Sequence, residues 1–150
     1  MSNSSYSRVH TCTSCGAKNR VPARHLADTG RCGACKAPLA PASEPIEVDE
    51  TAFGDIVRTA QVPVLVDFWA PWCAPCRMVA PQVHELAKEM AGRALVLKVN
   101  TERHPGLGAA YRVQAIPNFV VLRDGRPVVQ QPGAVPRAEM RRWIEEAERL

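Results

Sequence analysis

The chain has 150 residues, 46% of them hydrophobic and 23% charged, a composition that can bury a core and is unlike that of a disordered protein. All of its formal net charge of +4 lies in residues 1–45, and we interpret this modest excess as an ordinary solvated surface, so we expect no nucleic-acid partner. No apolar stretch could span a bilayer, and the polar start lacks the apolar core of a secretory signal, so we expect a cytoplasmic protein with no membrane partner.

Six cysteines form three C-x-x-C pairs, and the first two pairs predict a metal site. In a reducing compartment, cysteines are better explained as metal ligands or redox groups than as structural disulfides. The pattern C-x2-C-x16-C-x2-C, typical of a tetrahedral zinc site, is formed by Cys12, Cys15, Cys32 and Cys35. We expect Gly16 and Gly33 to give the two turns their backbone freedom. Four thiolates leave no open position for water, so we predict one structural Zn²⁺ per chain.

The segment before residue 46 has too little apolar content to fold alone, so a bound metal would supply the missing folding free energy. Two other interpretations remain open for its four cysteines: a rubredoxin-like iron centre and a pair of redox disulfides. His10 and His25 are alternative ligands. We predict a zinc-ribbon module over residues 1–37 and a linker rich in Pro and Ala over residues 38–45.

Residues 46–150 alternate between strand and helix patterns and are predicted to form one domain. Apolar runs and a hairpin signal at Asp124-Gly125 predict strands over 46–48, 62–70 and 94–100 and a hairpin over 118–130. The spacing of apolar residues predicts helices over 50–60, 75–90, 107–113 and 138–150. The order β-α-β-α-β-α-β-β-α predicts an α/β fold with a mixed, mostly parallel sheet covered by helices on both faces.

The third pair, Cys73 and Cys76, follows a buried strand and opens a helix. At such a point, unpaired backbone N–H groups and the helix dipole favour an anion, and therefore the thiolate form of Cys73. Since a thiolate is the nucleophile in disulfide exchange, we predict Cys73 to be the attacking residue. Cys76 lies one helical turn further on the same face, where it can close a reversible disulfide with Cys73.

This arrangement predicts a reaction with two exchange steps. Cys73 attacks a substrate disulfide to form a mixed disulfide, and Cys76 then attacks Cys73 and releases the reduced substrate. The chain carries no glycine pattern of a nucleotide-binding loop, so we expect no bound organic cofactor and a supply of electrons from a separate reductase.

Cys76 needs a base, and Asp67 is the candidate. Asp67 interrupts an apolar strand, where a charge is costly and an apolar residue would normally stand. Lys98 is alone in another apolar strand and is predicted to be the partner of Asp67 across neighbouring strands. The alternative is a structural Asp67 that is ion-paired at the edge of the sheet.

The motifs DFWAPWCAPC, RMVAP, AIPNF and the Asp-Gly hairpin closely resemble the thioredoxin family over residues 46–150. With the N-terminal cysteine pairs, the whole chain resembles the zinc-containing thioredoxin-2 type. The resemblance implies a thioredoxin fold, a protein-disulfide reductase activity and an NADPH-dependent thioredoxin reductase as the electron donor.

The resemblance also implies the roles of individual residues. Cys73 is the nucleophile, Cys76 the resolving thiol and Asp67 the buried proton acceptor, with Lys98 as its neighbour. Pro117 matches the cis-proline beside the active site of the family. The apolar surface that receives substrate, with the two residues between the cysteines, is expected to comprise Trp69, Trp72, Ala74, Pro75, Ile116, Gly133 and Ala134.

Two positions depart from the pattern of the family. Ala74-Pro75 stands where Gly-Pro is usual between the cysteines, and Asn118 stands where Thr commonly follows the cis-proline. The residues between the cysteines influence the stability of the thiolate, so a disulfide oxidase or isomerase remains an alternative. A third possibility is a zinc-dependent redox-sensing or binding protein with accessory exchange activity.

Overall fold

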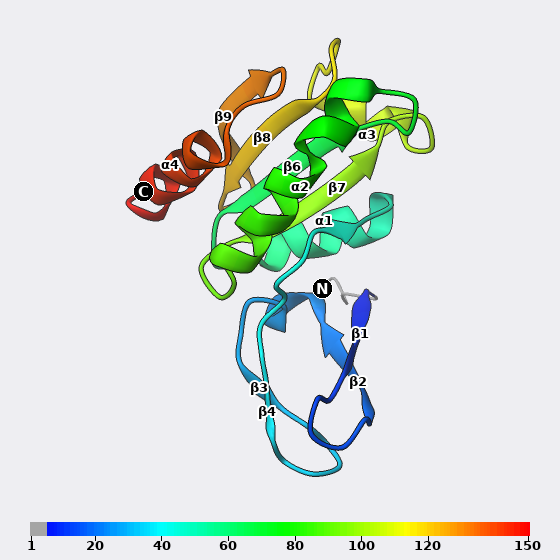
Figure 1. Ribbon diagram of the computed structural model, residues 1–150, viewed down its shortest axis with the longest axis vertical. Coiled ribbons are helices and arrows are strands. Elements are labelled where there is room, and N and C mark those ends of the chain that lie inside the picture. Colours follow the sequence, from blue (N-terminus) through cyan, green and yellow to red (C-terminus); the bar gives the residue numbers. More distant parts are fainter. Residues whose placement is uncertain (1–5) are drawn as a thin grey trace.

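The computed structural model describes residues 6–150, in which a five-stranded mixed sheet forms the centre (Figure 1). Its strands, in their spatial order, are β5 (Ile46–Glu47), β7 (Leu95–Asn100), β6 (Val64–Trp69), β8 (Asn118–Arg123) and β9 (Arg126–Pro132). The first three of these are parallel, while β8 and β9 run antiparallel to their neighbours. This sheet and its helices confirm the predicted α/β fold.

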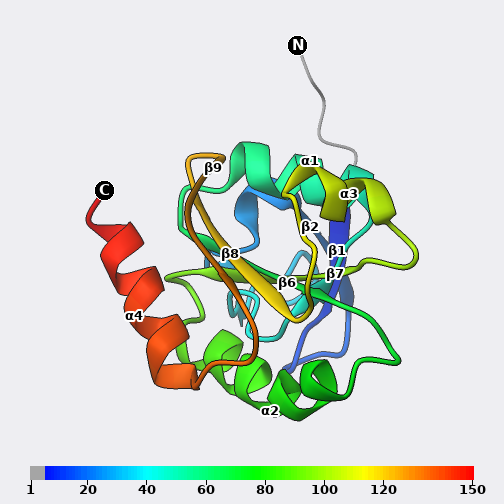
Figure 2. The same ribbon diagram turned by 90° about the horizontal axis from the view of Figure 1, so that it is seen from above.

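Helices cover both faces of the sheet (Figure 2). One face carries α1 (Glu50–Thr59) and α3 (Pro105–Ala110), and the other carries α2 (Ala74–Glu89) and α4 (Arg137–Glu148). A separate cluster of buried apolar side chains fills the space on each face. No helix within residues 6–150 is long and apolar enough to cross a membrane.

Local signals explain where the elements begin and turn. Asp49 caps α1, because its carboxylate accepts a hydrogen bond of 2.8 Å from the backbone N–H of Ala52. The turn between β8 and β9 falls at Asp124 and Gly125, both with positive φ angles of 52° and 77°. This conformation matches the right-handed twist of the hairpin strands, as the Asp-Gly pair predicted.

The first described residues form a small module on the α1 side of the sheet (Figure 1). Two two-stranded antiparallel sheets build it, with a short 3-10 helix between them: β1 (Ser7–Thr11) with β2 (Lys18–Pro22), β3 (Gly30–Arg31) with β4 (Pro38–Leu39), and η1 (Ala23–His25). Strand β4 falls within the range predicted as a linker, and the proposed division of the chain at residues 38–45 stays a prediction.

The module packs directly on the larger domain. Ala23 and Leu26, 1% and 2% exposed, belong to the same buried cluster as Phe53 and Ile56 of α1. The backbone N–H of Tyr6 also donates a hydrogen bond of 2.9 Å to the carboxylate of Asp55 in α1. The hydrophobic core is therefore continuous from η1 and Leu26 into the domain, while Cys12, Cys32 and Leu39 form a separate small cluster.

Candidate functional site

A disulfide between Cys73 and Cys76 lies at the N-terminus of α2. The two Cα atoms are 5.3 Å apart, and both cysteines are buried. Cys73 is the N-cap residue of α2, and the backbone N–H of Cys76 donates to its sulfur over 3.2 Å. An N–H group at a helix N-terminus stabilises negative charge, so the same geometry favours a thiolate on Cys73 after reduction.

Backbone groups next to the start of β8, which pairs with the end of β6, approach the disulfide. The carbonyl oxygen of Ile116 lies 3.7 Å from the sulfur of Cys73, and the Ile116–Pro117 peptide bond is cis. The backbone N–H of Gly133 donates a hydrogen bond of 2.8 Å to the carbonyl oxygen of Pro117. These contacts tie the segments around residues 116 and 133 together beside the disulfide.

The residues predicted to receive substrate differ in their contacts. Trp69 and Ile116 are half-buried and pack against the two cysteines. Trp72 is 64% exposed, next to Cys73 in the chain. Three of the others, Ala74, Pro75 and Ala134, are exposed, and Gly133 is half-buried.

Met78 is a residue that the sequence reasoning missed. It is 79% exposed on α2, two residues after Cys76. The helical pattern of buried positions, with Val79 and Val83, already places residue 78 on the opposite side of α2. A large apolar side chain on a solvated helix face close in sequence to the cysteine pair could therefore have indicated a contact surface.

Asp67 is buried in β6 with a polar atom unsatisfied. The residue is 1% exposed, and its Oδ1 atom has no hydrogen-bond partner in the described part of the chain. Burial raises the pKa of Asp67 to about 7, while Lys98 counteracts this rise and Glu47 adds to it. Lys98 is the direct register partner of Asp67 in β7. A carboxyl group that titrates near neutrality is suited to exchange a proton with a thiol.

We expect Asp67→Asn to stabilise the folded protein at neutral and alkaline pH. Because the folded pKa of about 7 lies above the ordinary 3.8, folding stability is lost as pH rises between these values. The difference of about three pKa units corresponds to a cost on the order of 4 kcal/mol above neutrality, which the Asn variant avoids. Urea unfolding of the oxidised protein at about pH 4.5 and about pH 8 measures it. An equal gain at both pH values would contradict the ionisation of Asp67 as the cause.

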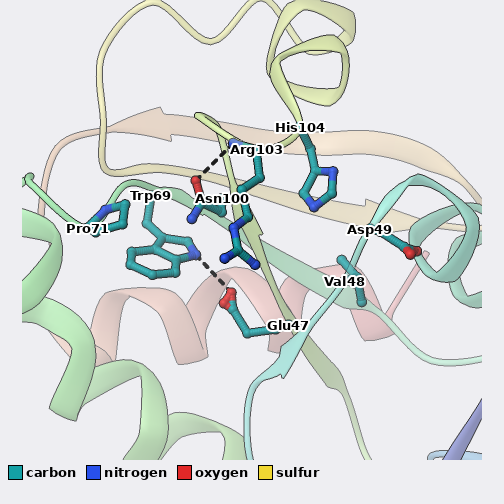
Figure 3. Close-up of a pocket in the computed structure, with 8 residues that line it drawn as sticks. All are labelled: Glu47, Val48, Asp49, Trp69, Pro71, Asn100, Arg103 and His104. Atoms are coloured by element: carbon teal, nitrogen blue, oxygen red, sulfur yellow. Dashed lines mark hydrogen bonds between the residues drawn. The ribbon is translucent and has the colours of Figure 1, made fainter.

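A pocket of about 500 Å³ opens beside the segment that precedes the disulfide (Figure 3). Its walls come from β5, β6, β7 and the segments that follow these strands: Glu47, Val48, Asp49, Trp69, Pro71, Asn100, Arg103 and His104. The indole N–H of Trp69 donates a hydrogen bond of 3.2 Å to the carboxylate of Glu47. Figure 3 shows the side chain of Arg103 pointing toward the same carboxylate.

The other four cysteines form a cluster in the module. Their sulfur atoms all lie within 4.8 Å of one another, and two of the pairs, Cys12 with Cys35 and Cys15 with Cys32, are 3.7 Å apart. Zinc–sulfur bonds of about 2.3 Å in a tetrahedron would place sulfur atoms about 3.8 Å apart. These four residues therefore fit a tetrahedral metal ion.

Backbone and amide N–H groups support the cluster. The pKa of Cys32 is lowered to about 6, and the largest cause is the backbone N–H of Cys35. The side-chain amide of Asn19, whose Nδ2 lies 3.5 Å from the Cys32 sulfur, lowers it further. The alternative ligands His10 and His25 are not part of the described cluster, which contains cysteines alone, as the spacing predicted. His25 is instead paired with Asp28 at 2.8 Å.

The turns that begin at Cys12 and at Cys32 have the same backbone geometry, although different residues form them. Each turn closes with a hydrogen bond to the carbonyl of its first cysteine, from Gly16 to Cys12 and from Lys36 to Cys32. Gly16 and Lys36 have positive φ angles of 79° and 67°. The expectation that Gly33 supplies this freedom is wrong, because the left-handed position is four residues after the first cysteine in each turn. Lys36 adopts it although a side chain there is strained.

Comparisons with known proteins agree with both parts of the structure. The family model described as thioredoxin matches residues 44–146, and one described as "Thioredoxin 2, N-terminal" matches residues 11–37. Thioredoxin C-3 of Corynebacterium nephridii is 40% identical over 138 residues, which cover 92% of this chain and 94% of that protein. Thioredoxin of Haemophilus influenzae is 36% identical over 102 residues, or 68% of this chain and 95% of that protein. A mutant thioredoxin from Halobacterium salinarum superposes with a TM-score of 0.67 and 32% identity over 73% of this chain and 95% of that chain.

Proposed function

Since the chain belongs to the thioredoxin family of disulfide oxidoreductases, we propose that it reduces protein disulfides with Cys73 as nucleophile and Cys76 as resolving thiol. One observation carries these roles: the sulfur of Cys73 caps α2 and accepts the backbone N–H of Cys76. The sulfur that can hold negative charge is the one that attacks, because disulfide exchange proceeds through a thiolate.

The reaction transfers two electrons to the substrate in two steps. The Cys73 thiolate attacks one sulfur of the substrate disulfide, which forms a mixed disulfide and releases the other substrate sulfur as a thiolate that takes up a proton. Cys76 gives its proton to the Asp67 carboxylate and attacks Cys73, which releases the second substrate sulfur as a thiolate that also takes up a proton. The products are a substrate dithiol and the Cys73–Cys76 disulfide seen in the structure.

Substrate is proposed to lie across the surface around the disulfide. Its backbone would run beside the Ile116 carbonyl and the segment at Gly133 and Ala134, both held next to Pro117. Trp69, Trp72, Ala74 and Pro75 would supply apolar contact, and the exposed Met78 extends the same surface along α2. We propose an NADPH-dependent thioredoxin reductase as the partner that reduces the disulfide again.

We also propose that the cluster of Cys12, Cys15, Cys32 and Cys35 holds one structural Zn²⁺. The sulfur distances support this, and four thiolates would complete the coordination, so the ion would supply folding free energy and no catalytic position. Free thiols that must bind a metal need a compartment that keeps them reduced, which supports the cytoplasm as the location.

Reduction of insulin disulfides with NADPH and a thioredoxin reductase tests the proposed direction of the reaction. We expect turnover, and in glutathione buffers of varied ratio we expect the Cys73–Cys76 pair to stay oxidised until conditions are strongly reducing. The second candidate, an oxidase or isomerase, is favoured by Ala74 in place of the usual Gly. A pair that is already reduced by mildly reducing glutathione would support that candidate instead.

A further inference from the structure

Three ionisable side chains form a row across neighbouring strands. Glu47 of β5 is the register partner of Lys98 in β7, and Lys98 is the register partner of Asp67 in β6. Register partners in adjacent strands point to the same face of a sheet, and each step across the sheet is about 4.8 Å. The row therefore runs from the solvent-exposed edge at Glu47 to the buried Asp67 below α2.

Lys98, in the middle of this row, does not form an ion pair with the buried Asp67. Within residues 6–150, no ion pair of 4.0 Å or less joins Lys98 to Asp67 or to Glu47, and Oδ1 of Asp67 has no hydrogen-bond partner. The Nζ atom of Lys98 lies instead over the ring of Trp69, 4.4 Å from the ring centroid. The same indole donates its N–H to the Glu47 carboxylate.

We propose that Glu47 is a positioning residue for disulfide exchange, which holds Trp69 by its indole N–H and draws the Lys98 ammonium toward the edge of the sheet, away from Asp67. This rests on the proposed function of Asp67 as the base for Cys76. An ammonium that lies over the Trp69 ring, with Glu47 as its neighbour in β5, stabilises the Asp67 carboxylate less than a direct ion pair would.

The groups that can influence the pKa of Asp67 come from the elements around it. Lys98 comes from β7 and Glu47 from β5, while β8 presents the apolar Phe119. Cys73 and Cys76, at the N-terminus of α2, titrate only when the disulfide is reduced. In the oxidised protein, Lys98 and Glu47 are therefore the groups that can alter the proton affinity of Asp67 across the sheet.

Glu47→Gln removes the charge of this residue and keeps an oxygen that can accept the Trp69 N–H. Two strand spacings put Glu47 and Asp67 about 10 Å apart, where direct repulsion between the carboxylates alone accounts for roughly 0.3 to 1.2 in the pKa of Asp67. A variant that also releases Lys98 should lower the measured pKa of Asp67 by more than this. The measurement is the carbon NMR titration of the Asp67 carboxyl in the oxidised protein. This titration involves no catalytic turnover, so its result can be interpreted even if the proposed function is wrong.

Glu50→Gln is the matched control, because it removes the same charge at the start of α1, where Glu50 pairs with His104 at 2.8 Å. We expect the pKa of Asp67 to be unchanged in this control. An Asp67 pKa that is equal in Glu47→Gln and Glu50→Gln would overturn the proposal.

The route through Lys98 is tested by repeating Glu47→Gln in a Lys98→Gln background. If Glu47 acts by holding the ammonium, the fall in the pKa of Asp67 should be smaller there than in the wild-type background. A fall of equal size in both backgrounds would show direct repulsion between the two carboxylates and would also overturn the proposal.

Discussion

Cys73→Ser is expected to lower the rate of protein-disulfide reduction on the order of 10³-fold or more, since a serine hydroxyl does not ionise near neutral pH and cannot replace the thiolate. The structure gives this residue alone the N-cap position of α2 and the N–H of Cys76. The measurement is insulin reduction coupled to NADPH consumption through a thioredoxin reductase. Full activity of this variant would remove Cys73 from the role of nucleophile.

Cys76→Ser is the matched variant, because it leaves the attacking sulfur in place and removes the resolving one. It should also lose turnover, but it should accumulate a mixed disulfide between Cys73 and the substrate, which mass spectrometry of the unreduced complex detects. A mixed disulfide on Cys76 in Cys73→Ser, with none on Cys73 in Cys76→Ser, would reverse the two roles.

The sequence predicted the fold well because its signals are local. The capping carboxylate of Asp49, the Asp-Gly turn at residue 124 and the apolar run around Asp67 each act within a few residues. The C-x-x-C spacing likewise predicted the cluster of sulfurs in the module, since each turn brings two sulfurs together by itself. The second turn still differed, because Lys36 rather than Gly33 adopts the left-handed conformation.

The sequence predicted that Lys98 and Asp67 lie on neighbouring strands, but it did not predict that Glu47 lies next to them. Glu47 looks like an ordinary exposed residue in a short strand, and only the β5–β7–β6 order aligns it with Lys98 and Asp67. The order of strands in a sheet is decided by packing of the whole domain, and no residue near Glu47 encodes it. The pocket beside Trp69 arises in the same way, from segments that are far apart in the chain.

The contact between the module and the domain could not be predicted from local sequence signals either. Ala23 and Leu26 are ordinary apolar residues in the sequence, but both are almost fully buried in a cluster with α1. The Pro-rich segment that follows them was therefore interpreted as a connector, although the backbone N–H of Ala42 donates a hydrogen bond of 2.8 Å to Leu26. A module that shares its core with a domain should also share its stability.

Removal of the metal is expected to lower the stability of the whole chain. Without an ion, the four thiols of the cluster lose the bonds that offset the ordering of the module, and Leu26 leaves the surface of α1. Loss of that buried side chain alone costs about 2 to 5 kcal/mol. The midpoint of urea unfolding, followed by the fluorescence of Trp143 in the α2–α4 core, should therefore fall when zinc-loaded protein is compared with protein stripped by a chelator.

Leu26→Ala is the matched control, because it weakens the same contact and leaves every cysteine in place. It should keep one equivalent of bound zinc but should show part of the same fall in the unfolding midpoint of the domain. Equal midpoints for zinc-loaded and stripped protein would show that the module and the domain unfold independently. Disulfide reduction should persist in both samples below their midpoints, since the disulfide lies at the end of α2, on the face of the sheet opposite to α1.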